Sequence, residues 1–261
     1  MPHPLPFIQH GSQGGHDFDL DETMPSGTIL VPVRDDLARY NQFAFSLAAM
    51  SKPPGTKLIV STGLNIVASL NDSIENDFAG EWLYLLGDDH IIPQHAVPRL
   101  WSHGVDIVGS VNFTRRAPFF WTLFKEPAGP PEEGGWELYG DDELPPVGLA
   151  EVGGVGSAGL MIRRNVIEAF MEDRGHVFTN TSGRSINEDL EFCLHARKLG
   201  FKVHCDMGMR LGHLGTMFTV AHYDDDEGWG VNIELPGGYG RIYLPGVDHR
   251  KRLKPKEEVA A

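Results

Sequence analysis

The sequence predicts an α/β protein, with a mostly parallel sheet flanked by helices in a single domain. Short apolar runs of the kind found in buried strands alternate with segments whose apolar residues recur at helical spacing. Such alternation is typical of parallel sheets, because the crossover between parallel strands usually contains a helix. Apolar residues make up 41% and charged residues 22%, values close to the averages of folded domains.

The expected elements occur in two groups, separated by a long irregular segment. Pro118 to Pro146 is rich in Pro, Gly and Glu without a regular period, which predicts a long loop or a hairpin excursion. Aromatic residues in this segment are equally suited to stacking on sugar rings and to core packing: Phe119, Phe120, Trp121, Phe124 and Trp136. Strands are expected at 28–33, 57–61, 82–86, 105–111, 160–163 and 202–204, and helices at 40–48, 65–78, 97–101, 165–171 and 188–199.

Both ends of the chain differ in character from the middle. Residues 1–26 lack sustained periodicity and are expected to form an N-terminal arm, and residues 27–216 are expected to form the folded domain. Residues 217–261 are interpreted as an acidic loop followed by a tail. Within them, Tyr223 to Trp229 carries three consecutive aspartates and is predicted to be a solvated loop able to cover a ligand pocket.

The charge balance narrows the possible partners. With 36 acidic and 22 basic side chains the formal net charge is −14, so nucleic acid is not an expected partner. No stretch approaches the ~20 apolar residues of a membrane span, so no transmembrane segment is expected and the cytoplasm is the expected compartment. Two cysteines, Cys193 and Cys205, do not make a disulfide framework and are expected to be reduced.

The most informative segment is Leu85-Leu86-Gly87-Asp88-Asp89-His90, which places two carboxylates directly after an expected buried strand. Ligands of open α/β sheets bind beyond the carboxyl ends of the strands. A carboxylate at that position can hold a divalent cation, which can bridge the oxygens of a diphosphate. Taken alone, an Asp-Asp pair is more often a solvated turn with a local cap, so the rest of the chain has to decide.

Trp82 to His90 resembles the strand and Asp-x-Asp signature of the GT-A fold glycosyltransferases, in particular their family-2-like branch. Other segments resemble this family in order and approximate spacing over residues 27–216. They are Ile66 to Asp72 (donor-side helix), Gly104 to Arg116 (next strand and loop), 156–159 (small-residue acceptor-side turn), 187–193 (Glu-Asp motif) and 206–215 (the strand that carries a metal-binding histidine).

The resemblance implies a GT-A-like, metal-dependent transferase. It would move a monosaccharide from a nucleotide-diphosphate sugar to a hydroxyl acceptor, which would be a glycan, lipid head group, protein or small molecule. The implied ion is Mn²⁺ or Mg²⁺, and inversion is the implied outcome if an aspartate serves as direct base. The residues it assigns are Asp89 and His213 (metal), Asp189 and Glu188 (catalysis), and Pro32, Arg34, Asn71 and Asp88 (donor).

Several of these residues have simpler explanations when each is considered alone. One histidine among twelve is usually structural or exposed, so His213 depends on the resemblance for its role. Acids in a first helical turn are favoured by the helix dipole, which accounts equally well for Glu188 and Asp189. The alignment also places Gly87 where the first aspartate of the family motif stands, so another residue must take that role.

Two further motifs support other interpretations. Residues 154–159 satisfy the Gly-x-Gly-x-x-Gly pattern of dinucleotide sites, but they lack a clear preceding strand, which favours a small-residue turn. Gly87 to His90 is also similar to the Gly-Asp-x-His element of metallophosphoesterases, which use two metals to activate water. That hydrolase and a non-catalytic nucleotide-sugar-binding protein are the alternatives to a transferase.

Overall fold

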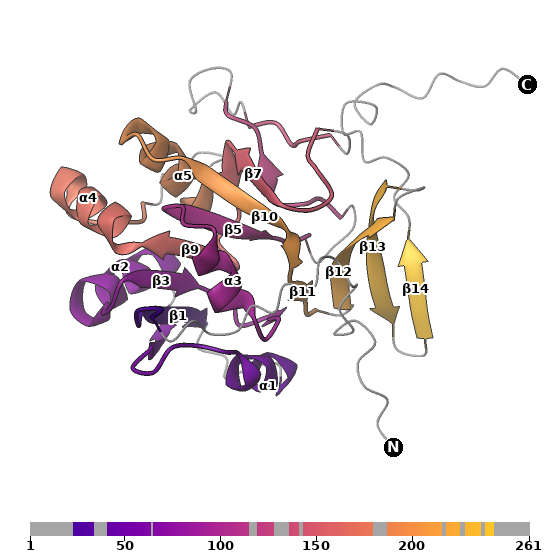
Figure 1. The fold of residues 1–261 in the computed structure, drawn as a ribbon, viewed down its shortest axis with the longest axis horizontal. Coiled ribbons are helices and arrows are strands. Elements are labelled where there is room, and N and C mark those ends of the chain that lie inside the picture. The colour runs from indigo at the N-terminus through magenta and orange to yellow at the C-terminus, as the bar shows by residue number, and fades with distance from the viewer. Residues whose placement is uncertain are drawn as a thin grey trace, which may run out of the picture.

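The computed structural model describes residues 23–33, 41–63, 65–114, 119–127, 136–140, 143–179, 187–215, 218–224, 228–235 and 238–242. Its centre is a seven-stranded mixed sheet (Figure 1). The strands of this sheet are β1 (Thr28–Val33), β2 (Lys57–Thr62), β3 (Trp82–Leu85), β5 (Ile107–Val111), β7 (Leu149–Val152), β9 (Leu160–Arg163) and β10 (Val203–Arg210).

The strand order of the central sheet is β2-β1-β3-β9-β5-β10-β7. Strands β1, β2, β3, β5 and β10 run in one direction, while β9 and β7 run against their neighbours. The α/β class predicted from the alternating pattern is therefore confirmed. Because the five parallel strands share a direction, their carboxyl ends lie along one edge of the sheet.

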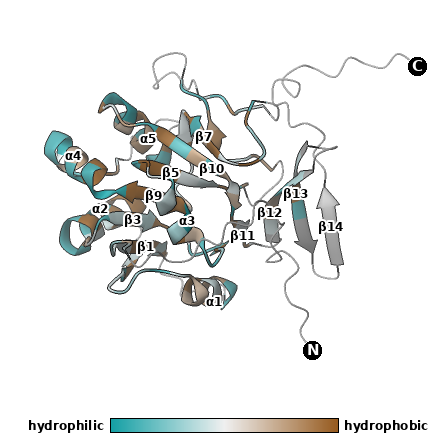
Figure 2. Ribbon diagram, viewed as in Figure 1, coloured by the Kyte–Doolittle hydropathy of each residue, from teal (hydrophilic) through white to brown (hydrophobic). Residues whose placement is uncertain are grey.

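Helices pack on both faces of this sheet, as the alternating apolar pattern requires. Side chains of α2, α4 and α5 share one hydrophobic cluster, which includes Leu83 and Leu85 of β3. Side chains of α1 and α3 share a second cluster with Trp82 and Tyr84, which point to the opposite face of the same strand. In Figure 2 the outward surfaces of α2 and α4 are hydrophilic. The helices are α1 (Asn41–Ala49), α2 (Ile66–Asp77), α3 (Ala96–Ser102), α4 (Arg164–Arg174) and α5 (Glu188–Lys198).

A second, five-stranded antiparallel sheet lies beside the first, in the order β14-β13-β12-β11-β4 (Figure 1). It joins two two-residue strands that lie far apart in the sequence, β4 and β11, to three successive antiparallel strands, β12 to β14. A third pair, β6 (Leu123–Phe124) with β8 (Gly154–Val155), is separate from both sheets. The strands of the second sheet are β4 (His90–Ile91), β11 (Gly212–His213), β12 (Phe218–Asp224), β13 (Gly228–Leu235) and β14 (Gly238–Ile242).

The C-terminal strands correct the expectation of an acidic loop and tail beginning at residue 217. Residues 218–224 and 228–235 form β12 and β13, and the Trp229 side chain is only 1% exposed. Trp229 packs edge-on against Trp121 and Tyr223, which lie within reach only after the chain has folded. The aspartate-rich run interrupts the apolar alternation that would predict paired strands, so the sequence does not indicate this pairing. Residues 225–227 of the run lie outside the described part of the chain.

The segment predicted as a long loop is partly ordered into short pairings. Trp121 bridges to Phe113, and Leu123 and Phe124 form β6. Phe119 and Trp121 are buried in the core. Of the two roles that the sequence allowed for these rings, sugar stacking and core packing, the structure therefore shows core packing. Phe120, Phe124 and Trp136 are partly buried.

The structure also describes the two cysteines and the start of helix α4. Cys193 and Cys205 are free, as predicted, and both are buried. Helix α4 begins at Arg164, and the expected cap Asn165 instead lies inside the first turn, where its amide binds Asp106 at 2.9 Å.

In the described residues, no helix has both the length and the apolar character needed to cross a membrane.

Asn71, predicted to contact the donor, fastens α2 to the segment after α4. Its amide nitrogen donates to the carbonyl of Phe178 at 2.8 Å, and its amide oxygen accepts from Val177 N at 3.1 Å and Phe178 N at 2.9 Å. Both polar atoms of the Asn71 side chain are therefore engaged by the backbone. These three hydrogen bonds give the residue a structural explanation in place of the expected donor contact.

Asn71→Ala is expected to lower the free energy of unfolding by about 1–2 kcal/mol, because the partly buried backbone groups of 177–178 lose their partners. Urea denaturation measures this change. Asn76→Ala is the matched control, because the Asn76 amide bonds Asp72 within the same exposed helix turn, and we expect a change within about 0.5 kcal/mol. Equal losses in the two variants would contradict the assigned role.

Candidate metal centre and active site

Asp89 stands just beyond the carboxyl end of β3, where the sequence predicts it. Every residue of β3 is buried, and β3 runs parallel to β1 in the middle of the sheet. The pairing continues one residue past the strand, since Leu86 N donates to Leu30 O at 3.0 Å. The chain then turns through Gly87, Asp88 and Asp89 into β4, so the turn lies at the edge where parallel strands end.

His213 is brought to Asp89 from 124 residues away by the second sheet. The pairing of β11 with β4 sets His213 directly opposite His90, and it sets Gly212 opposite Ile91. A backbone hydrogen bond from Leu214 N to Asp89 O, 2.7 Å long, locks the same register. The two histidines are thus a cross-strand pair whose side chains point to the same face.

The strand that leads to His213 is anchored by a buried carboxylate. Asp206 on β10 is 0% exposed and accepts from Arg99 Nε at 2.6 Å and Arg99 Nη2 at 2.7 Å, while His103 Nε2 lies 2.8 Å away. Burial alone would raise the pKa of Asp206, but the hydrogen bonds from His103 and Arg99 hold it well below its usual range. Helix α3, which carries Arg99, thereby fixes β10, and β10 fixes the position of β11.

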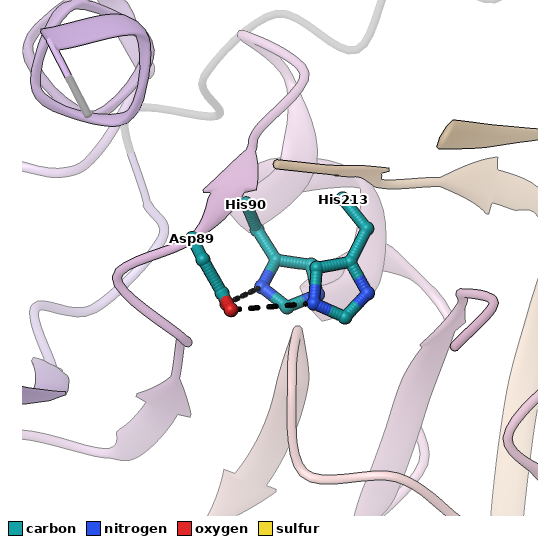
Figure 3. Close-up of side chains that lie close together, drawn as sticks. All are labelled: Asp89, His90 and His213. Atoms are coloured by element: carbon teal, nitrogen blue, oxygen red, sulfur yellow. Dashed lines mark hydrogen bonds and ion pairs between the residues drawn. The ribbon is translucent and has the colours of Figure 1, made fainter. Parts of the chain in front are cut away.

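Asp89, His90 and His213 form one compact cluster (Figure 3). Asp89 Oδ1 lies 2.9 Å from His90 Nδ1, and Asp89 Oδ2 lies 3.3 Å from His213 Nε2. The two imidazole rings are stacked, with centroids 4.2 Å apart and planes inclined by 25°. The three candidate ligand atoms all lie within 4.8 Å of one another, a spacing that one metal ion can bridge.

The tautomer of His213 is fixed by its second nitrogen. His213 Nδ1 lies 2.7 Å from the carbonyl oxygen of Phe113, and a carbonyl can only accept, so Nδ1 carries a hydrogen. Nε2 of the neutral ring is then a lone pair directed at a carboxylate oxygen. Two acceptors facing each other require a cation between them, either a proton or a metal ion. A backbone carbonyl behind a ligating histidine is also the usual outer partner in metal sites.

The electrostatics of Asp89 favour the ionised form that a metal needs. Burial raises its pKa, but hydrogen bonds and charge interactions with His213 and His90 outweigh burial and hold the pKa well below the usual range. An Asp89 carboxylate is therefore present at neutral pH. Its side chain is 14% exposed, so the carboxylate keeps partial contact with solvent.

His90 is the site residue that the sequence analysis missed. Its ring is buried, with the residue 4% exposed, and it contacts both other members of the cluster. A signal was present in the sequence, because His90 directly follows Asp89 in the segment singled out. The contact to His213 had no such signal, since it depends on the β4–β11 register.

Asp189 lies at the start of α5, with an environment suited to a proton acceptor. Burial, and then the charge of adjacent Glu188, raise the pKa of Asp189 to about 6, although the backbone N–H groups of Leu190 and Ser157 donate to it. Ser157 belongs to the turn 156–159, in which Gly159 N donates to Leu85 O at 2.9 Å. The turn therefore connects Asp189 to the end of β3, where the metal cluster begins.

The turn 156–159 is not part of a dinucleotide site. It is followed by strand β9, whereas the Gly-x-Gly-x-x-Gly fingerprint requires a helix at that point. Gly159 has φ +73°, and an added Cβ would lie 2.5 Å from Leu211 Cδ1. The preference for a small-residue turn is thus supported by the element order, and Asn112 Nδ2 holds the turn through Ala158 O at 2.9 Å.

Of the other predicted donor residues, Pro32 and Asp88 lie in the described part of the chain and Arg34 does not. Pro32, near the end of β1, lies at the same sheet edge as the Asp89 turn, because β1 and β3 are parallel and Leu30 is paired with Leu85. Asp88 is in that turn, partly buried beside Asp89. Arg34 lies outside the described residues.

Comparison with known proteins finds similar solved structures but assigns the chain to no protein family. No protein-family model matches the sequence, and no curated protein matches it. Among solved structures, the chain is similar to A197 from STIV, with a TM-score of 0.48 and 13% sequence identity over 82% of this chain and 96% of A197. The function must therefore be inferred from the residues of this chain.

Proposed function

We propose that this protein is a metal-dependent glycosyltransferase of GT-A type, which transfers a monosaccharide from a nucleoside-diphosphate sugar to a hydroxyl group. The observation that carries the proposal is the meeting of Asp89 with His213 at the carboxyl edge of the parallel strands. The resemblance named both residues as ligands of one ion. Two residues can hold one ion only if the fold brings their side chains together, and the side chains of Asp89 and His213 are in contact.

The donor set fits a divalent cation, as the facing lone pair of His213 Nε2 and carboxylate of Asp89 indicate. The net charge of −14 adds a second reason, because a diphosphate approaching this protein needs a local positive charge. When bound, a divalent ion would act as a Lewis acid on the departing diphosphate. Asp89 and His213 would hold that ion, and Pro32 and Asp88 lie on the same edge to contact the donor.

Asp189 is proposed as the general base. As the acceptor oxygen forms its bond to the anomeric carbon, the bond from that carbon to the diphosphate breaks and the hydroxyl proton passes to the Asp189 carboxylate. A base is most effective when its pKa lies near the working pH, and the pKa of Asp189 is about 6. Single displacement of this kind inverts the anomeric configuration. Glu188 contributes through its charge, which helps to raise the pKa of Asp189.

The two alternatives lead to different expectations. A two-metal phosphoesterase needs more ligands than the single group of three His and Asp side chains found among the described residues. A non-catalytic nucleotide-sugar-binding protein would keep the metal-supported donor site without needing a base of raised pKa. Asp189, at the start of α5, accepts a hydrogen bond from the turn that contacts the end of β3, and its pKa is raised, which together favour an enzyme.

A panel of UDP-, GDP- and dTDP-sugars, tested with Mn²⁺ and with Mg²⁺, would test the proposal. We expect one nucleotide class to raise the melting temperature only when a divalent ion is present, because a ligand that binds only the folded state stabilises it. Nucleotide release should then increase when a hydroxyl acceptor is supplied, such as a glycan, lipid head group, protein or small molecule. Donor binding without release under any of these acceptors would favour the non-catalytic alternative.

A further inference from the structure

His90 occupies the space that a side chain at position 87 would need. A Cβ built on Gly87 would lie 2.8 Å from His90 Nδ1 and 2.9 Å from Asp89 Oδ1. Both distances are shorter than real Cβ contacts, and both atoms belong to the cluster in Figure 3. A side chain at 87 therefore requires the His90 ring and the Asp89 carboxylate to move from these positions.

This crowding at position 87 bears on the missing first aspartate of the Asp-x-Asp signature. The alignment puts Gly87 at that position, and the structure puts the His90 imidazole where a side chain from 87 would begin. The exchange removes a carboxylate from the site and adds a nitrogen donor. The group at this edge then has one carboxylate and two imidazoles, in Asp89, His90 and His213.

We propose that His90 is a third ligand of the metal ion and that the resulting Asp-His-His donor set selects a late first-row transition ion, of the Co²⁺ or Zn²⁺ class, over Mg²⁺. This inference deepens the proposed function by naming the ion class of the same site. Imidazole nitrogens bind zinc, nickel and related ions well, whereas Mg²⁺ prefers carboxylate, carbonyl and water oxygens. Two imidazoles and a single carboxylate thus disfavour Mg²⁺.

The geometry of the cluster supports His90 as a metal ligand rather than as a residue that only packs beside the site. His90 Nδ1 is directed to Asp89 Oδ1 at 2.9 Å, and His213 Nε2 is directed to Asp89 Oδ2 at 3.3 Å, so both nitrogens face the same carboxylate. The register opposite His213 and the stacked rings hold the two imidazoles together before any ion binds. Preorganised ligands of this kind lose little conformational entropy on binding.

Metal binding to the metal-free full-length chain, without nucleotide, tests this inference. The probes are Co²⁺, Zn²⁺ and Mg²⁺ alone, followed by calorimetry and, for Co²⁺, by the visible absorption spectrum, which reports nitrogen ligation. We expect Co²⁺ to bind the unaltered chain at least about a hundredfold more tightly than Mg²⁺. His90→Ala should weaken Co²⁺ binding by about tenfold or more and change its spectrum.

A compensating exchange gives a gain of Mg²⁺ affinity, which a variant that fails to fold cannot show. Gly87→Asp combined with His90→Ala removes the contact with the ring, places a carboxylate at position 87 and requires only the Asp89 carboxylate, 2.9 Å from the added Cβ, to shift. We expect this double variant to bind Mg²⁺ about tenfold or more tightly than His90→Ala does, and so to lower the preference for Co²⁺ over Mg²⁺. His195→Ala is the matched control, because His195 also contacts an aspartate, Asp173 at 2.9 Å, and should leave both affinities unchanged.

The outcomes separate this inference from the proposed function. If His90→Ala folds, judged by its melting temperature and circular dichroism, and binds Co²⁺ with unchanged affinity and spectrum, His90 is not a ligand and the inference is overturned. An unchanged metal preference in the double variant would overturn it as well. If metal binding depends on His90 but no nucleoside diphosphate binds, the inference stands and the glycosyltransferase proposal fails.

Discussion

Asp189→Asn is expected to lower the rate of sugar transfer by about two orders of magnitude or more while leaving donor binding intact. The amide keeps the shape of the side chain, and its oxygen can still accept the hydrogen bond from Leu190 N, but it does not take a proton from the acceptor hydroxyl. Single-turnover transfer and donor affinity, measured separately, check both parts. Asp173→Asn, an exposed aspartate on α4, is the control that should change neither quantity.

The raised pKa of Asp189 also sets the expected pH dependence. Because a base must be ionised to accept a proton, transfer should rise as the pH increases through about 6, the pKa of Asp189 in the folded protein. Glu188→Gln should move this rise to lower pH, since the charge of Glu188 helps to raise that pKa. Unchanged transfer in Asp189→Asn, or a product with retained configuration, would leave Asp189 without the role of direct base.

The same substitution should stabilise the fold at neutral pH. The folded pKa of Asp189, about 6, lies above its ordinary value of 3.8, so the stability that the protonated side chain contributes is present below pH 3.8 and is lost as the pH rises through 6. Above pH 6 the asparagine variant should therefore be more stable than the unaltered protein by roughly 1–3 kcal/mol. Denaturation at pH 4 and pH 7.5 measures this difference. A gain in stability that coincides with a loss of transfer is typical of a functional residue.

Asp89→Ala is expected to abolish most of the metal-supported binding of nucleoside diphosphate, a loss of about a hundredfold or more. The side chain faces both histidines, and no other carboxylate belongs to this cluster among the described residues. The backbone bond from Leu214 N to Asp89 O does not involve the side chain, so the register of β4 and β11 should survive. Calorimetry with and without a chelator measures the metal dependence, and equal affinities in the unaltered protein would reject the metal bridge.

A double-mutant cycle with His213→Ala tests whether the two residues share one ion. If they do, the combined loss should be smaller than the sum of the single losses, because the second substitution removes a ligand from a site that is already empty. If His213 only holds β11 to Phe113, the single variant should lose folding stability and keep a nearly normal metal dependence. Asp77→Ala, which breaks the exposed pair with Lys57, is the control for removing an aspartate.

The sequence by itself predicted the α/β class, the position of Asp89 and six of the seven strands of the central sheet, but not β7. Each depends on local information: the apolar run of β3 requires burial on both faces, and a carboxylate after such a strand must emerge at the carboxyl edge of a parallel sheet. Asp189 was identified by the Glu-Asp motif together with the start of a helical pattern. The free state of the two cysteines followed from composition, whereas their burial is seen only in the structure.

Only the tertiary structure decided which side chains meet. The His90–His213 pair depends on the register of two two-residue strands that are distant in the chain, and no periodicity can reveal strands so short. Strands β12 and β13 are not predicted by the sequence, because polar side chains interrupt the apolar alternation, while Trp229 is buried against Trp121 from a distant segment. The raised pKa of Asp189 and the use of Asn71 as a backbone clamp likewise arise from burial and long-range hydrogen bonds, which exist only once the chain has folded.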